Sequence, residues 1–561
     1  IYTFDSGATT KLKAFSWASL TSGEQGYFNN KICGTFSQCS SLTDAQKAEA
    51  NKGQNLVNYL RGQTQHEGIL YRDRELALGD PVSAKPVYVK APRFGFTHPA
   101  SPDYATFKVA NSTRQAMLYV AANDGMLHAF NADTGEERWA YVPRMLLPNL
   151  YKLAEANYAA AHSFFVDGSP QVMDVVIGGA WRTILVGGLN AGGRGYYALD
   201  ITDPANPKAL WEICHDSALC AVSDPDLGYS YGNPVITQRP TDGKWVVLVT
   251  SGYNNVSPGT GRGYLFVLDA ETGSVLRKVD TGVGDTATPS GLARISAYAD
   301  DFNLNNTAKW VYGGDLLGNV WRFDLQTDPP SVLKIAELKD SSGKPQSVTV
   351  APELGLVSGY RVIFLGTGRY LGVNDLVDPA TLGLPYAYQQ SVYAIKDSNV
   401  AYGNFRTSGA VQQTITQLDP TTRTVSNNPV DWSSGSGWYV DLNPGNVSPG
   451  ERVNLDPQLV LGTLVVASNI PSATACTVGG ESWIYQFNYA TGSYVATAPS
   501  HIVATKLPGN TLAVGMVIVR LPSGQLKVIT TGAAGNKETL GVHTGGGGGG
   551  GRKISWRELI K

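Results

Sequence analysis

The chain has 561 residues, of which 44 are basic and 46 acidic, and a formal net charge of −2. This balance lacks the basic excess typical of nucleic-acid binding and the polybasic anchor typical of attachment to anionic lipid, and no stretch approaches the roughly 18 apolar residues of a membrane-spanning helix. We therefore expect neither nucleic-acid binding nor membrane insertion, while 63 glycines, 28 tyrosines and only 16% charged residues favour a turn-rich all-β protein.

The first 70 residues differ in pattern from the rest of the chain, and we predict an N-terminal extension over residues 1–85. The segment Thr43-Asp-Ala-Gln46 has the sequence of a capping box, and apolar residues between Ala45 and Leu60 follow at near-helical spacing. We predict one helix that ends near Arg61-Gly62. It would form part of a small N-terminal extension that packs on the outside of the main domain.

From about Val87 onward the chain consists of short β runs separated by Gly, Asn, Asp and Pro. Clear examples are MLYVA at 117–121, TILV at 183–186, WVVLV at 245–249 and LVV at 464–466. Short strands without helical patterns between them are typical of a sandwich, a barrel or a propeller.

An internal repeat decides among these three architectures. The clear copies are LHAFNADTG at 127–135, LFVLDAETG at 265–273 and IYQFNYATG at 484–492, and the degenerate copies are YYALD at 196–200, VWRFD at 320–324 and VYAIK at 392–396. Six copies at intervals of roughly 55 to 90 residues fit one four-stranded blade each.

We therefore predict a single, irregular β-propeller over residues 86–544. About seven blades are expected, because a divergent blade such as the one around Val362 to Leu365 lacks the repeat. A Gly-rich tether and C-terminal segment would follow at 545–561.

The five cysteines include two pairs with the spacing C-x5-C. These pairs predict the disulfides Cys33–Cys39 and Cys214–Cys220 and leave Cys476 free, which indicates an oxidising compartment. Five free thiols in a cytosolic protein are the alternative. The spacing does not suit zinc.

Catalytic signatures are missing from the sequence. Neither H-E-x-x-H nor G-x-S-x-G occurs. His128 lies on an alternating strand and is expected to be a core or rim histidine. The glycine-rich string at 192–195 lacks the Gly-Lys-Ser/Thr of a phosphate loop, and Asp315 in a Gly-Gly-Asp turn is expected to cap backbone groups.

The sequence resembles two families of proteins. The repeat pattern A-x-D-x-x-T-G-x-x-x-W resembles that of quinoprotein alcohol dehydrogenases, which are propellers that bind pyrroloquinoline quinone (PQQ). More specific strings resemble the PilY/PilC family of type IV pilus biogenesis proteins. These strings are VDGSP at 166–170, GGAWRT at 178–183, GGRG at 192–195, NDGMLHAF at 123–130, YVP at 141–143, GGDLLGNVWRFD at 313–324, GGESW at 479–483 and SWRE at 555–558.

The PilY-type resemblance implies a binding and regulatory domain that follows a von Willebrand-type region, which this sequence does not include. Such a domain acts extracellularly, at the pilus tip or outer cell surface, and reaches it through the periplasm. The resemblance implies minor pilins and a host-surface receptor as partners. It also implies a role in pilus extension against retraction, twitching motility and adhesion.

The alternative is a PQQ-dependent quinoprotein dehydrogenase. Those enzymes commonly carry two adjacent cysteines, which this chain lacks, and only the first repeat has both Thr-Gly and a following tryptophan, Trp139. We therefore expect a protein that is not an enzyme.

The PilY-type family often shows Leu-Arg-Gly-Asp where this chain has Leu60-Arg-Gly-Gln63. Gln63 lacks the carboxylate with which an Arg-Gly-Asp tripeptide would reach the metal of an integrin. We expect a helix C-terminal turn at Gly62 instead.

A candidate metal loop lies at 301–309. Calcium prefers oxygen ligands at alternating positions of a tight loop, and the residues at these positions are Asp301, Asn303, Asn305, Thr307 and Lys309. The loop resembles the EF-hand-like calcium loop of PilY-type proteins, in which the first three would supply side-chain oxygens and Thr307 its carbonyl. An Asn-rich turn without metal is the other interpretation.

Lys309 departs from that family pattern, because it stands at position nine, where the family places an aspartate. Since an ammonium replaces an anionic ligand, the calcium that the resemblance implies is expected to bind weakly or not at all. We predict instead that the Lys309 ammonium reaches the oxygens of Asp301 and Asn303. It would then hold the loop in a shape like the metal-bound one.

Overall fold

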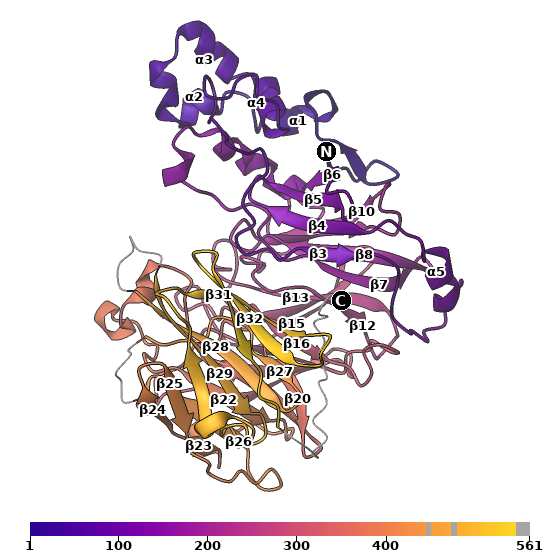
Figure 1. Ribbon diagram of the computed structural model, residues 1–561. Coiled ribbons are helices and arrows are strands. Elements are labelled where there is room, and N and C mark those ends of the chain that lie inside the picture. The colour runs from indigo at the N-terminus through magenta and orange to yellow at the C-terminus, as the bar shows by residue number, and fades with distance from the viewer. Residues whose placement is uncertain (445–449, 473–478, 546–561) are drawn as a thin grey trace. The chain divides into compact units, whose positions relative to one another are not determined.

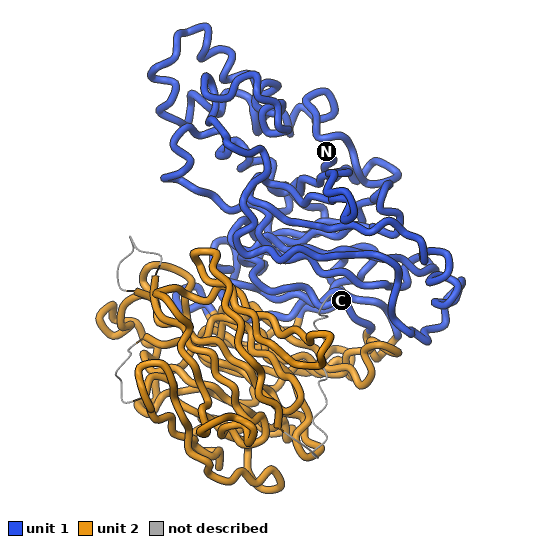
Figure 2. Tube along the Cα trace, in the orientation of Figure 1, with its two compact units in different colours: residues 1–238, 243–278, 285–289 blue, residues 239–242, 279–284, 290–561 orange. Residues whose placement is uncertain are grey.

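The computed structural model of the chain describes residues 1–444, 450–472 and 479–545 (Figure 1). The chain divides into two compact units (Figure 2). The first comprises residues 1–238, 243–278 and 285–289, and the second comprises residues 239–242, 279–284 and 290–561.

The N-terminal extension consists of short elements. In chain order they are β1 (Tyr2–Phe4), β2 (Leu12–Ala14), η1 (Trp17–Ser19), α1 (Ser22–Gln25), α2 (Ile32–Thr35), η2 (Ser37–Ser41), α3 (Asp44–Ala50) and α4 (Gly53–Leu60). The capping box predicted at Thr43 is confirmed, since its Oγ1 accepts from the amide of Gln46 at 3.3 Å.

The single helix predicted after Thr43 was wrong, because the chain forms α3 and α4 with a break between them. At Gly53, the first residue of α4, an added Cβ would lie 2.6 Å from the ring of Trp17. A residue with a side chain would push α4 away from this tryptophan, so the glycine permits the close approach.

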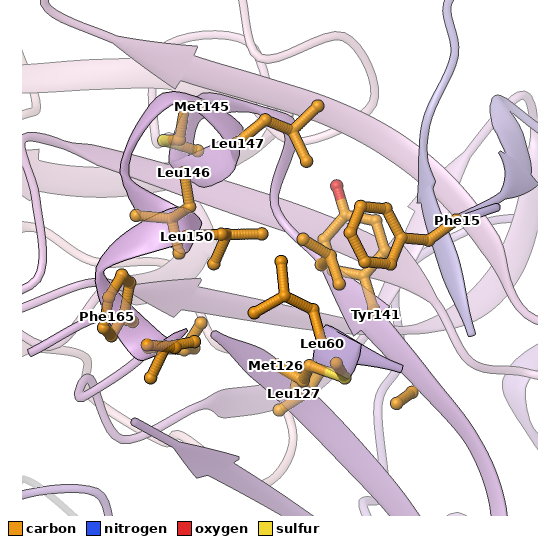
Figure 3. Packing of buried hydrophobic residues seen from close by; sticks show 14 of the residues in the cluster. Phe15, Leu60, Met126, Leu127, Tyr141, Met145, Leu146, Leu147, Leu150 and Phe165 are labelled. Carbon is orange, nitrogen blue, oxygen red and sulfur yellow. The ribbon is translucent and has the colours of Figure 1, made fainter. Parts of the chain in front are cut away.

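The extension is built into the first unit in two ways. Strand β1 pairs in parallel with β6, and Tyr2 lies opposite Tyr141. In addition, Phe15 and Leu60 are buried in the same apolar cluster as Leu127 and Leu150, as Figure 3 shows. The extension therefore contributes strands to the first sheet as well as packing against it.

The first unit holds three sheets, of which the third ends in residues assigned to the second unit. Their strands are β3 (Val87–Val89), β4 (Met117–Ala122), β5 (Met126–Asn131) and β6 (Glu137–Val142), joined by β1 and β2; β7 (Gln171–Ile177), β8 (Ala180–Gly188), β9 (Gly195–Asp200), β10 (Lys208–Cys214) and β11 (Val222–Ser223); and β12 (Val235–Gln238), β13 (Trp245–Thr250), β14 (Tyr264–Asp269) and β15 (Val275–Asp280). Its other helices are α5 (Tyr104–Ala110), η3 (Arg144–Ala154) and η4 (Tyr158–Ala160).

The described residues of the second unit form four sheets. Their strands are β16 (Ile295–Tyr298), β17 (Trp310–Gly314), β18 (Asn319–Asp324) and β19 (Ser331–Glu337); β20 (Glu353–Val357), β21 (Tyr360–Gly366), β22 (Ser391–Lys396), β26 (Gly437–Asp441) and β23 (Val411–Gln413); β24 (Ile415–Asp419), β25 (Thr422–Val425), β30 (Ile502–Lys506), β29 (Gly480–Asn488), β28 (Thr463–Pro471) and β27 (Gln458–Val460); and β31 (Ala513–Arg520), β32 (Leu526–Gly532) and β33 (Lys537–Gly541). Short 3-10 turns are η5 (Val373–Leu376), η6 (Pro379–Leu382), η7 (Phe405–Thr407) and η9 (Pro499–His501).

The described residues thus form seven successive sheets, in agreement with the predicted propeller of about seven blades. The six repeat copies lie on β5, β9, β14, β18, β22 and β29, one in each of six sheets. In four of these sheets the copy is the third strand in chain order, and in the sheets of β5 and β29, which include two additional earlier strands, it is the fifth. One detail was wrong. Residues 362–365 belong to β21, in the same sheet as the copy at 392–396, so the sheet without a copy is the seventh.

Both predicted disulfides are confirmed, Cys33–Cys39 and Cys214–Cys220. Cys476, most of the glycine run and the string SWRE at 555–558 lie outside the described residues. None of the helices in the described part of the chain is both long and apolar enough to span a membrane.

Candidate functional site

The predicted metal loop connects β16 and β17 in the second unit. These strands pair so that Tyr298 lies opposite Trp310, and the amide of Lys309 donates to the carbonyl of Tyr298 at 2.9 Å. The rings of Tyr298 and Trp310 lie 5.4 Å apart. The loop is therefore fixed at both ends by strand pairing.

Inside the loop, the oxygens expected to bind metal are used for local hydrogen bonds. The carboxylate of Asp301 accepts from the amides of Asn303 at 3.2 Å and Leu304 at 3.3 Å. The amide of Asn305 donates to the carbonyl of Asp301 at 2.7 Å, and the hydroxyl of Thr307 donates to the side-chain oxygen of Asn305. This pattern is an Asp-initiated turn.

Lys309 does not contact Asp301 and Asn303 as predicted. Its ammonium pairs with the carboxylate of Asp300, the residue before the alternating series. Asp301 instead directs its carboxylate at the amides of its own turn. The side chains of Lys309 and Asp300 are 36% and 59% exposed, so water screens the pair and weakens it.

The donor set of this loop fits calcium poorly. Calcium takes six to eight oxygen ligands, commonly including several carboxylates, whereas Asp301 is the only carboxylate at the alternating positions. Among the residues that the structure describes, no group of three or more His, Cys, Asp or Glu side chains is placed to hold a metal ion.

The strands behind the loop carry a buried charge network. The Arg361 guanidinium lies 3.9 Å from the centre of the Trp310 ring and pairs with Asp397, which also accepts from Arg322 at 2.9 Å and from the hydroxyl of Tyr312 at 2.7 Å. Burial by itself would raise the pKa of Asp397, but these partners hold the pKa below its usual value. The base of the loop is therefore rigidly anchored.

The string at 123–130 has a structural role. The carboxylate of Asp124 accepts from the amide of Gly79 at 3.0 Å. The amide of Asn123 donates to the carbonyl of Asp80 at 3.2 Å, and its side chain donates to the same oxygen at 3.0 Å. The turn between β4 and β5 thus holds the chain segment that leads from the extension into the first sheet.

The string VDGSP at 166–170 holds the next part of the same segment. Asp167 accepts from the amide of Ser83 at 2.8 Å, and Ser169 accepts from the amide of Lys85 at 2.9 Å. Burial raises the pKa of Asp167, whose second carboxylate oxygen is buried without a hydrogen bond. Together with Asn123 and Asp124, these side chains clamp residues 79–85.

His128 is buried, as predicted, but its partners could not be read from the sequence. Its Nε2 lies 2.9 Å from Asp124 and its Nδ1 lies 2.7 Å from Glu137. Burial would lower the pKa of His128, but hydrogen bonds and charge interactions with both carboxylates raise it to about 9. This charged histidine on β5 therefore links the turn between β4 and β5, through Asp124, to β6, through Glu137.

Two other motif residues also satisfy backbone groups. Arg194 donates to the carbonyls of Leu227 at 2.7 Å and Ser257 at 2.9 Å. Its guanidinium therefore binds backbone oxygens of the fold, whereas a phosphate loop directs its donors at a bound phosphate. Asp315 accepts from the amides of Leu317 at 3.0 Å and Asn319 at 2.8 Å, so the predicted capping role is confirmed.

The turn after α4 is a helix end, as predicted. Gly62 has a positive φ of 96°. Its amide donates to the carbonyl of Tyr59 at 2.9 Å, and the amide of Gln63 donates to that of Asn58 at 3.1 Å. These two bonds define a Schellman motif.

Tryptophans join successive sheets. The indole nitrogens of Trp139, Trp211 and Trp438 donate to the carbonyls of Pro204 at 2.8 Å, Ala270 at 3.0 Å and Tyr489 at 3.0 Å, each in the sheet that follows. An added Cβ at Gly273 would lie 2.6 Å from Trp211, and one at Gly492 would lie 2.5 Å from Trp438. The Thr-Gly turn thus receives a tryptophan from the preceding sheet, and such tryptophans are more numerous than the sequence predicted, because each lies in a different repeat from the turn that it contacts.

Comparison with known proteins agrees with this architecture. The crystal structure of the Pseudomonas aeruginosa PilY1 C-terminal domain is similar, with a TM-score of 0.63 and 28% sequence identity. The match covers 81% of this chain and 98% of that one.

Curated relatives are similar in sequence. The type IV pilus biogenesis factor PilY1 of Pseudomonas aeruginosa is 35% identical over 538 residues, covering 86% of this chain and 43% of the relative. A homologue from Xylella fastidiosa is 34% identical over 522 residues, covering 85% of this chain and 33% of the homologue. The chain spans less than half the length of these relatives. A family model described as the PilY1 beta-propeller domain matches residues 78–428, more than half of the chain, and the chain therefore belongs to the PilY1 family of type IV pilus biogenesis factors.

Proposed function

We propose that this chain is a binding and regulatory domain that acts extracellularly, at the pilus tip or outer cell surface. There it supports pilus extension against retraction, twitching motility and adhesion, through contacts with minor pilins and a host-surface receptor. The observation that carries the proposal is the similarity to PilY1 over 86% of the chain. We also propose the division into an extension (1–85), a propeller (86–544) and a terminal segment (545–561).

A non-catalytic role is part of this proposal. Its support is that the polar side chains of the motif strings, such as Asn123, Asp315 and Arg194, hold backbone groups of the fold. The competing PQQ-dependent dehydrogenase would have to oxidise alcohols. We expect no dye-coupled alcohol oxidation above background when quinone and calcium are supplied.

The test uses the full-length protein in its own bacterium. Deleting residues 86–544 should abolish twitching and reduce surface pili, and restoring the intact gene should recover both. Normal twitching and normal piliation after the deletion would disprove the proposed role. Separate counts of surface pili and of cells attached to host surfaces distinguish extension from adhesion.

For the loop at 301–309 we propose a regulatory element that keeps its shape without calcium. The support is the local bonding of Asp301 together with the Lys309–Asp300 ion pair. Calcium would then be a ligand that this chain binds weakly or not at all.

A further inference from the structure

A small cavity lies beneath the connection between β21 and β22 in the second unit. Its volume is about 30 Å³, and its walls include Arg369, Arg452, Asp375, Tyr388 and Gln390. A space of that size can hold about two water molecules or one compact polar group such as a carboxylate. We call it the Arg452 cavity.

Arg452 brings a buried charge without a directly paired carboxylate to this cavity. Its side chain is 7% exposed. Its Nε donates to the carbonyl of Gly450 at 2.7 Å, and its Nη1 donates to the carbonyls of Arg369 at 2.7 Å and of Asp375. Within the described chain no carboxylate lies at ion-pair distance from this guanidinium, and burial lowers the pKa of Arg452.

The other charges of the cavity do not balance Arg452. The Nε of Arg369 lies 3.4 Å from a carboxylate oxygen of Asp375, and it is buried without a hydrogen bond. The second oxygen of Asp375 accepts from the amides of Leu371 at 2.8 Å and Gly372 at 3.3 Å. Two guanidinium groups therefore share one carboxylate, and that carboxylate is already engaged.

Gln390 adds a second unsatisfied group. Its side chain is 8% exposed, its Nε2 donates to the carbonyl of Ala387 at 2.8 Å, and its Oε1 is buried without a partner. An unpaired buried acceptor is costly. The cavity therefore contains more guanidinium than carboxylate charge, and it also contains an amide oxygen that receives no hydrogen bond.

The connection around the cavity is unusually apolar at its surface. Five large apolar side chains within thirteen residues are exposed: Tyr370 (39%), Leu371 (42%), Val373 (70%), Val377 (41%) and Leu382 (44%). Val377 also lines the cavity. Exposed apolar groups gathered in this way are typical of a surface that binds another molecule.

We propose that the Arg452 cavity binds a carboxylate carried by an apolar peptide segment of a partner protein. The carboxylate would pair with the guanidinium of Arg452, since arginine suits planar carboxylates. A peptide N–H beside it would donate to Oε1 of Gln390, and the apolar side chains of the ligand would cover the five exposed residues. This site is separate from the loop at 301–309 and does not depend on the proposed pilus role.

The carboxylate can come from a chain end or from an acidic side chain, and peptides distinguish the two. The probes are acetyl-Leu-Leu-Val with a free carboxylate, the same peptide amidated, and acetyl-Leu-Glu-Leu amide, each titrated calorimetrically into the full 561-residue chain. At least one acidic probe should bind tenfold or more tightly than the neutral amide, and which one does so identifies the source. Equal affinities for all three, or no binding by either acidic probe, would refute the proposal.

Variants test the position of the site. Arg369→Gln should weaken the tighter acidic probe at least fivefold, because one of the two guanidinium groups is lost. Val373→Asp should weaken it at least tenfold, because it adds a negative charge at the rim, and its 70% exposure keeps the fold intact. Val109→Asp in the first unit, at 74% exposure, is the matched control and should bind as the unchanged chain does. Unchanged affinity in both Arg369→Gln and Val373→Asp would place any binding elsewhere and overturn the assignment.

Discussion

Arg423 and Lys309 are both cations of the second unit, and each is paired with one acidic residue, yet their surroundings are opposite. The side chains of Arg423 and Glu451 are 1% and 0% exposed, and two oxygens of Glu451 accept from the same nitrogen of Arg423 at 2.9 Å. Lys309 and Asp300 are 36% and 59% exposed. Water can replace the partner of each exposed group in the Lys309–Asp300 pair, but it cannot reach the Arg423–Glu451 pair. Loss of the buried pair should therefore lower the free energy of unfolding far more than loss of the exposed pair.

The largest expected effect comes from breaking the buried pair. Arg423→Met leaves the Glu451 carboxylate buried without its counter-charge, so the free energy of unfolding should fall by about 3–5 kcal/mol. Urea unfolding measures this loss. The matched control is Arg138→Met, which removes an exposed ion pair with Glu136 and should cost about 1 kcal/mol at most. Equal losses in the two variants would contradict the distinction.

His128 extends the comparison to a buried cation that can lose its charge. Because folding raises the pKa of His128 from 6.5 to about 9, its stabilising contribution is complete below about pH 6.5 and disappears as the pH rises through about 9. At about 1.4 kcal/mol per pKa unit, the contribution is at most about 3.5 kcal/mol. The free energy of unfolding of the wild-type chain should therefore fall between pH 6.5 and 9.5 relative to that of His128→Gln.

Glu137→Gln removes one of the two carboxylates next to His128 and should reduce this pH dependence without abolishing it. Parallel pH profiles for the wild-type chain and His128→Gln would show that the imidazole is neutral throughout.

Lys309→Asp tests the exposed cation of the comparison through the calcium affinity of its loop. The change replaces a cation by a potential ligand at position nine of the loop, so calcium affinity should rise at least tenfold, equivalent to about 1.4 kcal/mol. Isothermal titration of both chains measures it. Lys344→Asp, which adds the same charge at an exposed position outside the loop, should leave the affinity unchanged. Equal, tight calcium binding by the wild-type chain and Lys309→Asp would show that position nine is not a ligand.

The smallest effect is expected from Lys309→Ala. Since the pair with Asp300 is exposed, its loss should reduce the free energy of unfolding by less than about 1 kcal/mol. Asp300→Asn should have the same small effect, because it removes the same pair. A loss of several kcal/mol in thermal or urea unfolding would show that the ammonium holds the loop through contacts other than this pair.

The sequence correctly predicted features whose interacting residues lie close together in the chain. The repeat marked one strand in each of six sheets because it contains both the apolar strand and the turn that ends it. The capping box at Thr43, the helix end at Gly62 and the two short disulfide loops were likewise predicted, since all their partners lie within a few residues.

Contacts between distant residues were not predictable in the same way. The Thr-Gly turn at Gly273 receives Trp211 from the preceding sheet, so the two partners belong to different repeats. Gly53 at the start of α4 lies against Trp17, which is distant in the sequence. The acceptors of the Ser83 and Lys85 amides lie 84 residues away at Asp167 and Ser169. The partner of Lys309 was misjudged for a different reason, because alternation alone cannot show that Asp301 directs its carboxylate at its own turn.

The parallel pairing of β1 with β6 has a practical consequence for anyone who shortens this protein. A chain that starts at residue 78, where the family similarity begins, would lack β1 together with Phe15 and Leu60. The backbone groups of β6 opposite Tyr2 and Thr3 and the apolar surface around Leu127 would then face water. Open strand edges beside apolar surface promote aggregation. The part that can be purified in soluble form should therefore be longer than the part that sequence similarity outlines.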